Sequence, residues 1–311
     1  MRAAVVTSFD APPEYEEVPA PVARGEDELL VDVLAAGLHP RVRSQAGGSH
    51  YTSTGVLPLV PGVDGVGRDP DGRLRYFVLP DTTLGSMAER TLIDPRRSVV
   101  LDDAADPVAV AAAMNPAMSS WVALRRRIAF AAGQSVLVLG ATGNAGRMAV
   151  PIARHLGAAR VVAAARDATK LSRSDASDTV VLDDAERLAA RAADVDVVID
   201  YLWGEPAAAA MVTLVAARPD RAKPLTWIQI GSVAGPTAPI PSAALRASRL
   251  QIVGSGQGSV PTSDLVAELS ALAGEIARGT FAIDARAVPL ADVRRAWGEA
   301  GATAERVVLV P

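Results

Sequence analysis

Short alternating segments separated by frequent turn residues characterise the first hundred positions of the chain. Leu29 to Leu34 (LLVDVL) alternates apolar and charged side chains, as a half-buried β-strand does. Glycine and proline recur every few residues, for example in Pro61-Gly62 and in Asp69-Pro70-Asp71-Gly72. Strands interrupted this often predict an all-β domain with a barrel-like or sandwich-like sheet.

The pattern changes after Asp106, where alanine-rich helical stretches alternate with continuous apolar runs. Such runs of Val, Ile and Leu without alternation are typical of parallel strands that are covered on both faces. The predicted strands are Ser135–Leu139, Arg160–Ala164, Thr179–Leu182, Asp196–Ile199, Thr226–Ile230 and Leu250–Val253. Strands that alternate with helices in this way predict a doubly wound α/β domain.

A mixed segment closes the chain. Apolar residues recur at helical spacing from Ser263 to Arg278, which predicts a helix that ends before Gly279. A segment at Phe281–Pro289 follows, then a helix that opens near Ala291, and Arg306–Val310 (RVVLV) is predicted to be the last strand.

Composition narrows the possible functions. The chain has 311 residues, a formal charge of −4 and no cysteine, so disulfides, thiolate metal sites and a cysteine nucleophile are excluded. A slightly acidic chain lacks the basic balance of a nucleic-acid binder. The most apolar stretch, Val108 to Leu124, is built mostly of alanine and carries Asn115-Pro116, which predicts a buried helix rather than a membrane span.

The strongest functional motif follows the strand at 135–139 and leads into a helix. The segment GATGNAG matches the dinucleotide-binding fingerprint at two of its glycines, with Ala141 in place of the first. Gly140 can form the tight turn, Gly143 leaves room for a pyrophosphate, and Gly146 lets the helix pack closely on the strand. The motif therefore predicts a cofactor site formed by Gly140, Thr142, Gly143, Asn144, Ala145 and Gly146. A glycine-rich turn that binds nothing is the alternative.

The end of the second strand distinguishes NAD from NADP. In NAD enzymes an acidic side chain at this point binds the adenosine ribose. Here Arg166 follows the strand, and Lys170 and Arg173 come within the next residues. Cations suit a 2′-phosphate, so we predict NADPH as the cofactor, with Arg166 and Lys170 as its ligands. The alternative is that Asp167 binds the ribose and the basic side chains are solvated.

Three more segments complete a family pattern around the glycine motif. Gly37-Leu38-His39-Pro40 comes first, then Pro61-Gly62-Val63-Asp64-Gly65-Val66-Gly67, then Asn115-Pro116-Ala117-Met118-Ser119-Ser120-Trp121. Together with GATGNAG, this order resembles the medium-chain dehydrogenase/reductase superfamily, in its zinc-independent quinone oxidoreductase-like branch. The likeness spans nearly the whole chain.

The resemblance implies an α/β protein in which a GroES-like β-rich catalytic domain accompanies a doubly wound parallel-sheet (Rossmann) cofactor domain. The catalytic domain would comprise residues 1–115 and 257–311, the cofactor domain residues 116–256, and the active cleft would lie between them. Asn115 and Ser119 would bind the cofactor. Because parallel sheets bind ligands at the carboxyl ends of their strands, further contacts are expected from Gly231, Ser232, Gly254 and Ser255. Tyr201 and Trp203 would border the cofactor or the cleft, or else pack against the sheet.

Zinc-dependent members of the superfamily hold their metal with a Cys, a His with a neighbouring Glu, and a second Cys. The corresponding segments here are Leu38-His39, Val63-Asp64 and Asn115, and zinc needs three or four well-placed ligands. We therefore expect no metal. Without a Lewis acid, an enone or quinone is the favoured substrate, because it spreads the negative charge that develops during reduction.

Three residues are candidates for catalysis. His39 stands beside Pro40 where many relatives carry Asn-Pro near the nicotinamide ribose; it can instead be a loop histidine that caps the backbone. His50 and Tyr51 lie in the loop 47–55, which is rich in Gly, Ser and Thr and is either a wall of the cleft or a flexible surface loop. Our hypothesis is that Tyr51 donates a proton after hydride transfer, helped by a protonated His50, whereas the alternative is protonation by solvent. The resemblance gives Asp64 a bracing role.

These observations predict an NADPH-dependent, metal-independent oxidoreductase that reduces a quinone or another activated C=C or C=O compound. A carbonyl or enoyl-thioester reductase, or a catalytically idle NADPH-binding sensor, is the alternative. The expected partners are a small-molecule substrate and a second copy of the chain, paired through the strand at 250–253, with no nucleic acid and no membrane. A cytoplasmic location is the default expectation.

Overall fold

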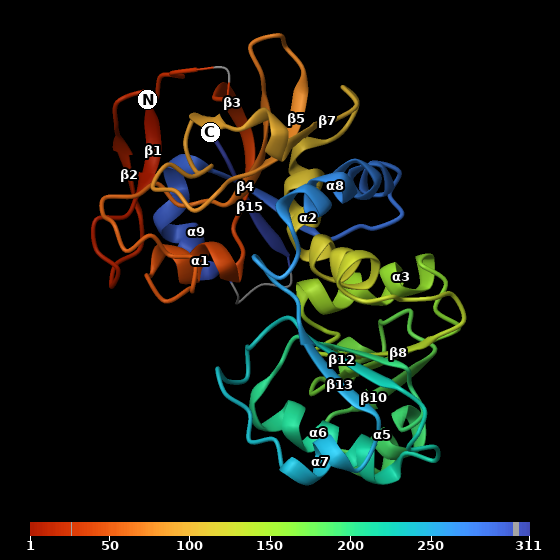
Figure 1. Cartoon of the computed structure of the whole chain (residues 1–311). Coiled ribbons are helices and arrows are strands. Elements are labelled where there is room, and N and C mark those ends of the chain that lie inside the picture. Colours follow the sequence, from red (N-terminus) through yellow and green to blue (C-terminus); the bar gives the residue numbers. More distant parts are fainter. Residues whose placement is uncertain (26, 301–304) are drawn as a thin grey trace. The chain divides into compact units, whose positions relative to one another are not determined.

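The computed structural model describes residues 1–25, 27–300 and 305–311. The chain forms two compact units (Figure 1). A β-rich unit comprises Met1–Asn115 and Val266–Pro311, and an α/β unit comprises Pro116–Leu265. The chain passes between the units within helices α2 (Pro107–Val122) and α8 (Thr262–Ala277). The second passage, at 265/266, lies nine residues after the expected boundary at 256/257.

Both ends of the chain contribute to the main sheet of the β-rich unit. Its order is β14-β15-β3-β4-β5-β7, with β6 also paired to β3. The antiparallel pairing of β15 with β3 joins Val308 to Gly37. The strands are β3 (Leu29–Gly37), β4 (Asp64–Arg68), β5 (Leu74–Val78), β6 (Arg90–Ile93), β7 (Ser98–Val100), β14 (Ala285–Pro289) and β15 (Arg306–Val310), and β1 (Arg2–Val5) pairs with β2 (Glu14–Glu17) outside this sheet.

Helices cover one end of this sheet. Val42 of α1 (Pro40–Ala46) and Val293 of α9 (Val293–Glu299) belong to one buried cluster with Leu38 and Leu309. Short 3₁₀ segments lie at η1 (Pro95–Arg97) and η3 (Leu290–Asp292). The predicted alternation in β3 is confirmed, since Val31 and Val33 are buried and Asp32 is exposed.

The α/β unit is built on a parallel sheet with the order β10-β9-β8-β11-β12-β13. Its strands are β8 (Ser135–Leu139), β9 (Arg160–Ala165), β10 (Asp178–Val181), β11 (Val197–Asp200), β12 (Leu225–Gln229) and β13 (Leu250–Gly254). From β8 the chain adds strands first on one side of the sheet, as β9 and β10, and then on the other, beginning with β11. The position between β8 and β11 is the topological switch point where such sheets bind ligands. This order confirms the predicted doubly wound fold.

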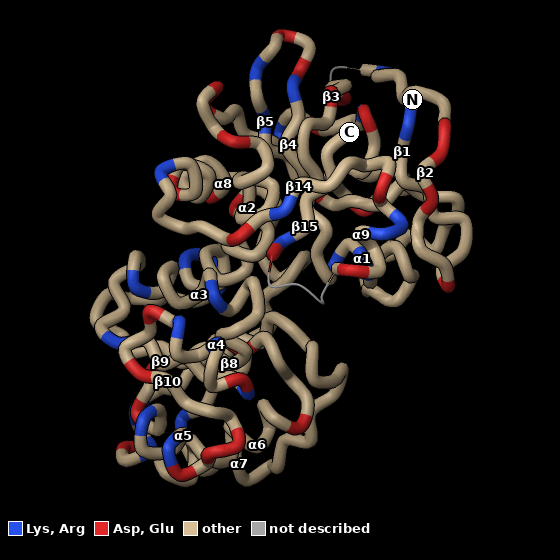
Figure 2. Tube along the Cα trace, turned by 180° about the vertical axis from the view of Figure 1, so that it is seen from behind, with Lys and Arg blue, Asp and Glu red and all other residues tan. Residues whose placement is uncertain are grey.

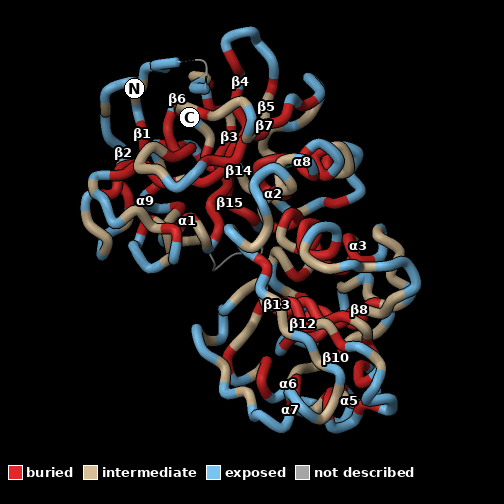
Figure 3. Tube along the Cα trace, viewed as in Figure 1, coloured by how far each residue is buried: buried red, intermediate tan, exposed pale blue. Residues whose placement is uncertain are grey.

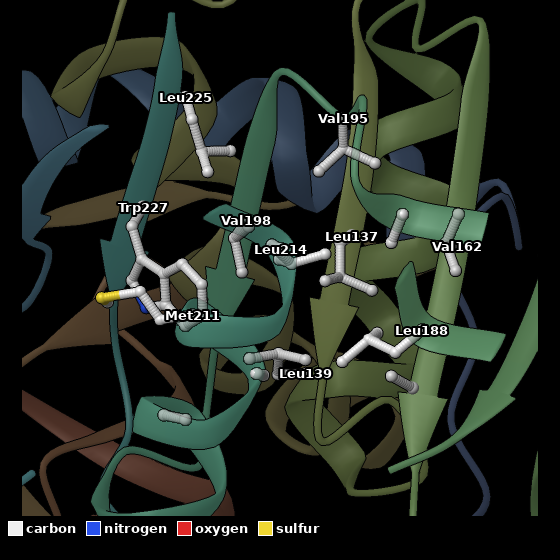
Figure 4. Packing of buried hydrophobic residues seen from close by; sticks show 14 of the residues in the cluster. Leu137, Leu139, Val162, Leu188, Val195, Val198, Met211, Leu214, Leu225 and Trp227 are labelled. Carbon is white, nitrogen blue, oxygen red and sulfur yellow. The ribbon is translucent and has the colours of Figure 1, made fainter. Parts of the chain in front are cut away.

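Helices lie on both faces of the parallel sheet (Figure 1). Helix α3 (Asn144–His155) covers one face, and α5 (Ala185–Ala192) and α6 (Gly204–Ala217) pack on the other. The shorter helices are α4 (Ala168–Leu171) and α7 (Ser242–Arg246). Figure 4 shows Leu188, Met211 and Leu214 directed at Leu137, Val198 and Trp227 of the strands. In Figure 3 the buried residues follow the strands of each unit.

One helix in the described part of the chain, Pro107–Arg127, is long and apolar enough to cross a membrane by length and composition alone. It consists of α2 and a π-helical turn, η2 (Ala123–Arg127). Since 72% of its apolar window is buried inside the protein, it has the character of a core helix, as predicted for this stretch. Figure 2 shows Lys and Arg interspersed with Asp and Glu over both units.

Candidate functional site

The glycine turn after β8 has the local geometry that a dinucleotide site requires. Gly140 has a φ of +83°, and its N–H donates to the Ala164 carbonyl at 2.9 Å. A Cβ on Gly146 would lie 2.2 Å from the Gly140 carbonyl oxygen, so only glycine lets α3 approach the turn this closely. Gly140 and Gly146 are therefore required for the conformation of the turn itself.

Gly143 differs from these two glycines because the space around it is open. A Cβ built there meets only the Gly140 carbonyl oxygen, at 3.5 Å. Gly143 is the N-cap of α3, a helix of 12 residues, and the side chains of Thr142, Asn144 and Ala145 beside it are half-buried. Open space at the amino end of a helix, where N–H groups and the positive end of the dipole are exposed, suits a pyrophosphate.

Arg166 follows the last residue of β9 directly and is exposed. Its guanidinium forms no hydrogen bond or ion pair with any residue that the structure describes. Asp167 is already engaged: Oδ1 accepts the Lys170 N–H at 3.0 Å and caps α4, and Oδ2 lies 3.7 Å from Lys170 Nζ. These interactions lower the pKa of Asp167, the hydrogen bond from the Lys170 N–H being the largest cause. Lys170 and Asp167 are thus paired with each other, whereas Arg166 makes no such contact within the described chain.

The loops after β12 and β13 contribute the remaining predicted cofactor residues. Gly231 packs against the backbone of Tyr201, where a Cβ would lie 2.6 Å from the Tyr201 carbonyl oxygen, and Ser232 is exposed. A Cβ on Gly254 would have no atom of a non-adjacent residue within 4 Å, and the Gly254 carbonyl accepts a hydrogen bond from Arg127 Nε at 2.6 Å. Ser255 is 9% exposed. Gly254 thus offers open space, whereas Gly231 serves packing.

Asn115 and Ser119 lie on α2, one turn apart. The Ser119 hydroxyl contacts the Pro116 carbonyl at 2.7 Å and the Tyr201 hydroxyl at 2.9 Å. Burial raises the pKa of Tyr201 to about 12, so its hydroxyl stays protonated at neutral pH. Asn115 is half-buried and its side chain has no hydrogen bond within the described chain. Ser119 therefore holds Tyr201 against α2, and the amide of Asn115 is the more available group.

A buried polar network lies in the β-rich unit and centres on Asp64 of β4. The carboxylate accepts hydrogen bonds from His39 Nε2 at 3.1 Å and from the Tyr76 hydroxyl at 2.7 Å. Each of these three side chains is at most 2% exposed. The Ser86 hydroxyl donates to the Asp64 carbonyl oxygen at 2.6 Å. Asp64 thus joins His39, which follows β3, to Tyr76 of β5.

The protonation of this network follows from burial. Burial lowers the pKa of His39 despite the opposing effect of Asp64, and burial together with Asp64 raises the pKa of Tyr76 well above its ordinary value. A carboxylate only accepts hydrogen bonds, so the proton of neutral His39 lies on Nε2. Its Nδ1 is a buried acceptor without a hydrogen-bond partner in the described chain. His39 does not cap α1 with its side chain.

Two arginines that the sequence analysis does not identify surround the network. Arg306, at the start of β15, is 6% exposed, and its Nη1 donates to the Leu38 carbonyl at 3.2 Å. Burial lowers its pKa to about 10. Arg41, in the first turn of α1, is largely buried, which lowers its pKa against the attraction of Asp64 and Tyr51. Arg306 meets His39 only through the pairing of β15 with β3, which no local sequence pattern announces.

The loop that carries His50 and Tyr51 has its own internal order. The Thr52 N–H donates to His50 Nδ1 at 3.2 Å, and the two aromatic rings stack at a centroid distance of 4.3 Å. Tyr51 is 72% exposed. Burial and, to a smaller extent, the charge of Arg41 lower the pKa of His50. This shift disfavours the protonated His50 that the hypothesis about Tyr51 invokes, and Arg41 is a second positive charge near Tyr51.

A small, partly open hollow lies beside α1 in the β-rich unit, lined by Val42, Gln45, Ala46, Thr54, Leu59, Val60, Pro61, Gly62 and Thr82. None of the three predicted catalytic residues lines it. Within the described residues, no group of three or more His, Asp or Glu side chains has the arrangement to hold a metal ion. Two of the three positions that were compared with zinc ligands, His39 and Asp64, form a hydrogen bond with each other.

Known proteins resemble this chain over its whole length. A probable NADPH-dependent quinone reductase of Emericella nidulans is 32% identical, with both chains covered completely. The quinone oxidoreductase of Thermus thermophilus, whose crystal structures include a complex with NADPH, superposes with a TM-score of 0.85 at 25% identity and complete coverage of both chains. The chloroplastic NADPH-dependent alkenal/one oxidoreductase of Arabidopsis thaliana is 30% identical over 47% of this chain and 42% of its own length. No protein-family model matches the chain.

Proposed function

This chain belongs to the medium-chain dehydrogenase/reductase superfamily, in its quinone oxidoreductase-like branch, and from that premise we propose that it is an NADPH-dependent oxidoreductase. It transfers hydride to a quinone or to another activated C=C or C=O compound, and it does so without a metal. The observation that carries this proposal is the open glycine turn at the switch point of the parallel sheet, with the uncommitted Arg166 at the end of the next strand.

The residues of the α/β unit fit NADPH. Gly143 and the amino end of α3 receive the pyrophosphate, and Thr142, Asn144 and Ala145 flank it. Arg166 receives the 2′-phosphate, with Lys170 as a weaker neighbour because Asp167 already attracts its ammonium group. Gly231, Ser232, Gly254 and Ser255 border the other half of the cofactor, as do Asn115 and Ser119 of α2. We assign residues 116–256 to this cofactor domain and residues 1–115 and 257–311 to the catalytic domain.

The catalytic groups lie in the β-rich unit. When bound, NADPH supplies the hydride. We propose that Tyr51 donates a proton from its hydroxyl to the reduced substrate, that stacking by His50 positions the Tyr51 ring, and that Arg41 supplies positive charge near it. His39, held by Asp64 with Nδ1 as an acceptor, orients a hydroxyl or N–H of a bound ligand.

The role of Tyr51 is tested by single-turnover hydride transfer with Tyr51→Phe. A positioned acid contributes about 10²–10⁴ in rate, so the variant should lose a factor in this range while it binds NADPH as before. A rate and a pH profile equal to those of the parent would remove Tyr51 from the mechanism and leave protonation to solvent.

The proposed independence of metal rests on the types of residue available. The chain has no thiolate, and His39 and Asp64 already satisfy each other. Purified protein should keep its activity in the presence of a strong chelator, and elemental analysis should find no stoichiometric metal. One tightly bound zinc per chain would contradict the proposal.

Consumption of NADPH against a panel of quinones, enones and aldehydes tests the substrate class. We expect turnover with para-quinones and enones, and little with simple aldehydes, because only conjugated substrates spread the developing charge. Turnover confined to aldehydes or enoyl thioesters would identify a carbonyl or enoyl-thioester reductase. Stoichiometric NADPH binding with no turnover on any substrate would identify an idle NADPH-binding protein and reject the enzyme.

We further propose a homodimer in the cytoplasm, the compartment in which a reductase of small molecules has ready access to NADPH. Support for pairing comes from β13, an edge strand whose side chains are only half-buried, since an unpaired edge is a liability in water. Light scattering should give twice the monomer mass. A charged residue in place of Ile252 should separate the two subunits, so that the measured mass becomes that of the monomer. Monomers at all concentrations would reject the dimer, and membrane-bound protein after cell fractionation would reject the location.

A further inference from the structure

The backbone at Trp203 adopts a conformation that side chains rarely tolerate. Its φ is 53° and its ψ is −162°, and it is the one non-glycine residue with a positive φ in the described ranges. This part of backbone space is almost restricted to glycine, and a bulky residue held there is strained. Strain of this kind persists only where the surroundings impose it, and it concentrates at functional sites.

Several interactions impose this conformation. Asp200, which is fully buried, accepts the N–H groups of Leu202 at 2.8 Å and of Trp203 at 3.0 Å through one carboxylate oxygen. Its other oxygen accepts Trp227 Nε1 at 3.0 Å. The following Gly204 also has a positive φ, and a Cβ there would lie 2.8 Å from the Ala234 carbonyl oxygen. The turn at 200–204 is thus fixed at both ends.

The turn lies at the carboxyl end of β11, directly beside the glycine turn. Leu202 packs over Gly140, where a Cβ would approach the Leu202 side chain to 3.1 Å. In the strand order, β9 with Arg166 lies on one side of the switch point, and β11, β12 and β13 lie on the other. A dinucleotide that places its adenosine at Arg166 and its pyrophosphate over Gly143 therefore extends its nicotinamide half toward β11.

We propose that Trp203 is a binding residue for the nicotinamide half of NADPH. This inference rests on the proposed function and extends it to a residue that the dinucleotide fingerprint does not contain. The indole is half-buried: it packs against the core cluster of the α/β unit and leaves the rest of its surface accessible. A rigid aromatic ring at this place offers an apolar face to the nicotinamide riboside, and the strained backbone holds it there before the cofactor binds.

Calorimetric titration of full-length variants with NADPH and with adenosine 2′,5′-bisphosphate tests the proposal, because the second ligand lacks the nicotinamide half. Trp203→Gly removes the ring, and because glycine adopts a positive φ without strain, the backbone conformation of the turn is kept. We expect it to weaken NADPH about three- to tenfold, the range for one aromatic contact, and to leave adenosine 2′,5′-bisphosphate unchanged. Trp203→Phe, which keeps an aromatic ring, should restore most of the NADPH affinity.

The matched control is Arg166→Ala, which should weaken both ligands. If Trp203→Gly loses equal affinity for both ligands, or loses none for either, the inference is overturned. Trp203 would then serve only to pack against the core. Parent protein that binds neither ligand would overturn the proposed function and this inference together. Tight NADPH binding by the parent with an unaffected Trp203→Gly variant would reject only the inference.

Discussion

In the proposed site, Arg166 is the residue that distinguishes NADPH from NADH. Its neighbour Asp167, the residue that would bind the ribose of NADH, uses its carboxylate to cap α4. Arg166→Ala should therefore weaken NADPH by about 1.5–3 kcal/mol, the range for a hydrogen bond to a charged group, and leave NADH almost unchanged. Lys170→Ala should cost less, because Asp167 already attracts that ammonium group. Equal losses for NADPH and NADH, measured by titration, would show that the 2′-phosphate lies elsewhere.

His39 makes folding stability depend on pH. Burial lowers its pKa below the ordinary value of 6.5, so below pH 6.5 the unfolded chain binds a proton that the folded chain does not yet take. The stabilisation is complete above pH 6.5 and is lost as the pH falls through the folded value, with a slope of up to about 1.4 kcal/mol per pH unit. His50 contributes in the same direction.

Chemical unfolding between about pH 7 and pH 4.5 checks this prediction. His39→Gln should be less stable at pH 7 and should show a flatter pH dependence than the parent, whereas His50→Gln should flatten it less because His50 is only half-buried. An unchanged slope in His39→Gln would mean that folding does not shift the pKa of His39.

At the scale of the element, two glycines of the same turn are expected to have different roles: Gly146 is needed for folding and Gly143 for binding NADPH. A methyl group on Gly146 would collide with the Gly140 carbonyl, so Gly146→Ala should lower the melting temperature and disrupt the turn. A methyl group on Gly143 meets nothing closer than 3.5 Å, so Gly143→Ala should fold normally and yet bind NADPH at least about tenfold more weakly, since the methyl occupies the place of the pyrophosphate. Thermal unfolding and titration of both variants would decide; normal NADPH binding by Gly143→Ala would remove the pyrophosphate from this turn.

The strands of the parallel sheet follow from sequence patterns because those patterns are local. Apolar runs mark each parallel strand, and the last strand, 306–310, has the same bounds in the prediction and in the structure. Only part of the candidate site can be predicted from the sequence. GATGNAG and Arg166 lie in one continuous segment and are visible in the sequence. Tyr76 reaches Asp64 across the pairing of β4 with β5, and Arg306 reaches the Leu38 carbonyl only through the pairing of the distant strands β15 and β3. The cap that occupies Asp167 depends on a hydrogen bond rather than on residue type.

The lowered pKa of His50 and the strain at Trp203 also lie beyond sequence reasoning. The pKa of His50 depends on burial and on the charge of Arg41, and the φ of Trp203 depends on a buried carboxylate three residues earlier. Both are consequences of tertiary packing, and both concern the residues closest to the proposed chemistry.

Transfer of label from cofactor to substrate tests the central claim most directly. An enone would be reduced by the purified protein with NADPH that carries deuterium at C4 of the nicotinamide, and the product analysed by mass spectrometry and NMR. The account predicts one deuterium per molecule of product, located on the carbon β to the carbonyl, with NADH much less efficient than NADPH at equal concentration. A reduced product without deuterium, or a protein that binds NADPH but reduces neither enones nor quinones, would contradict it.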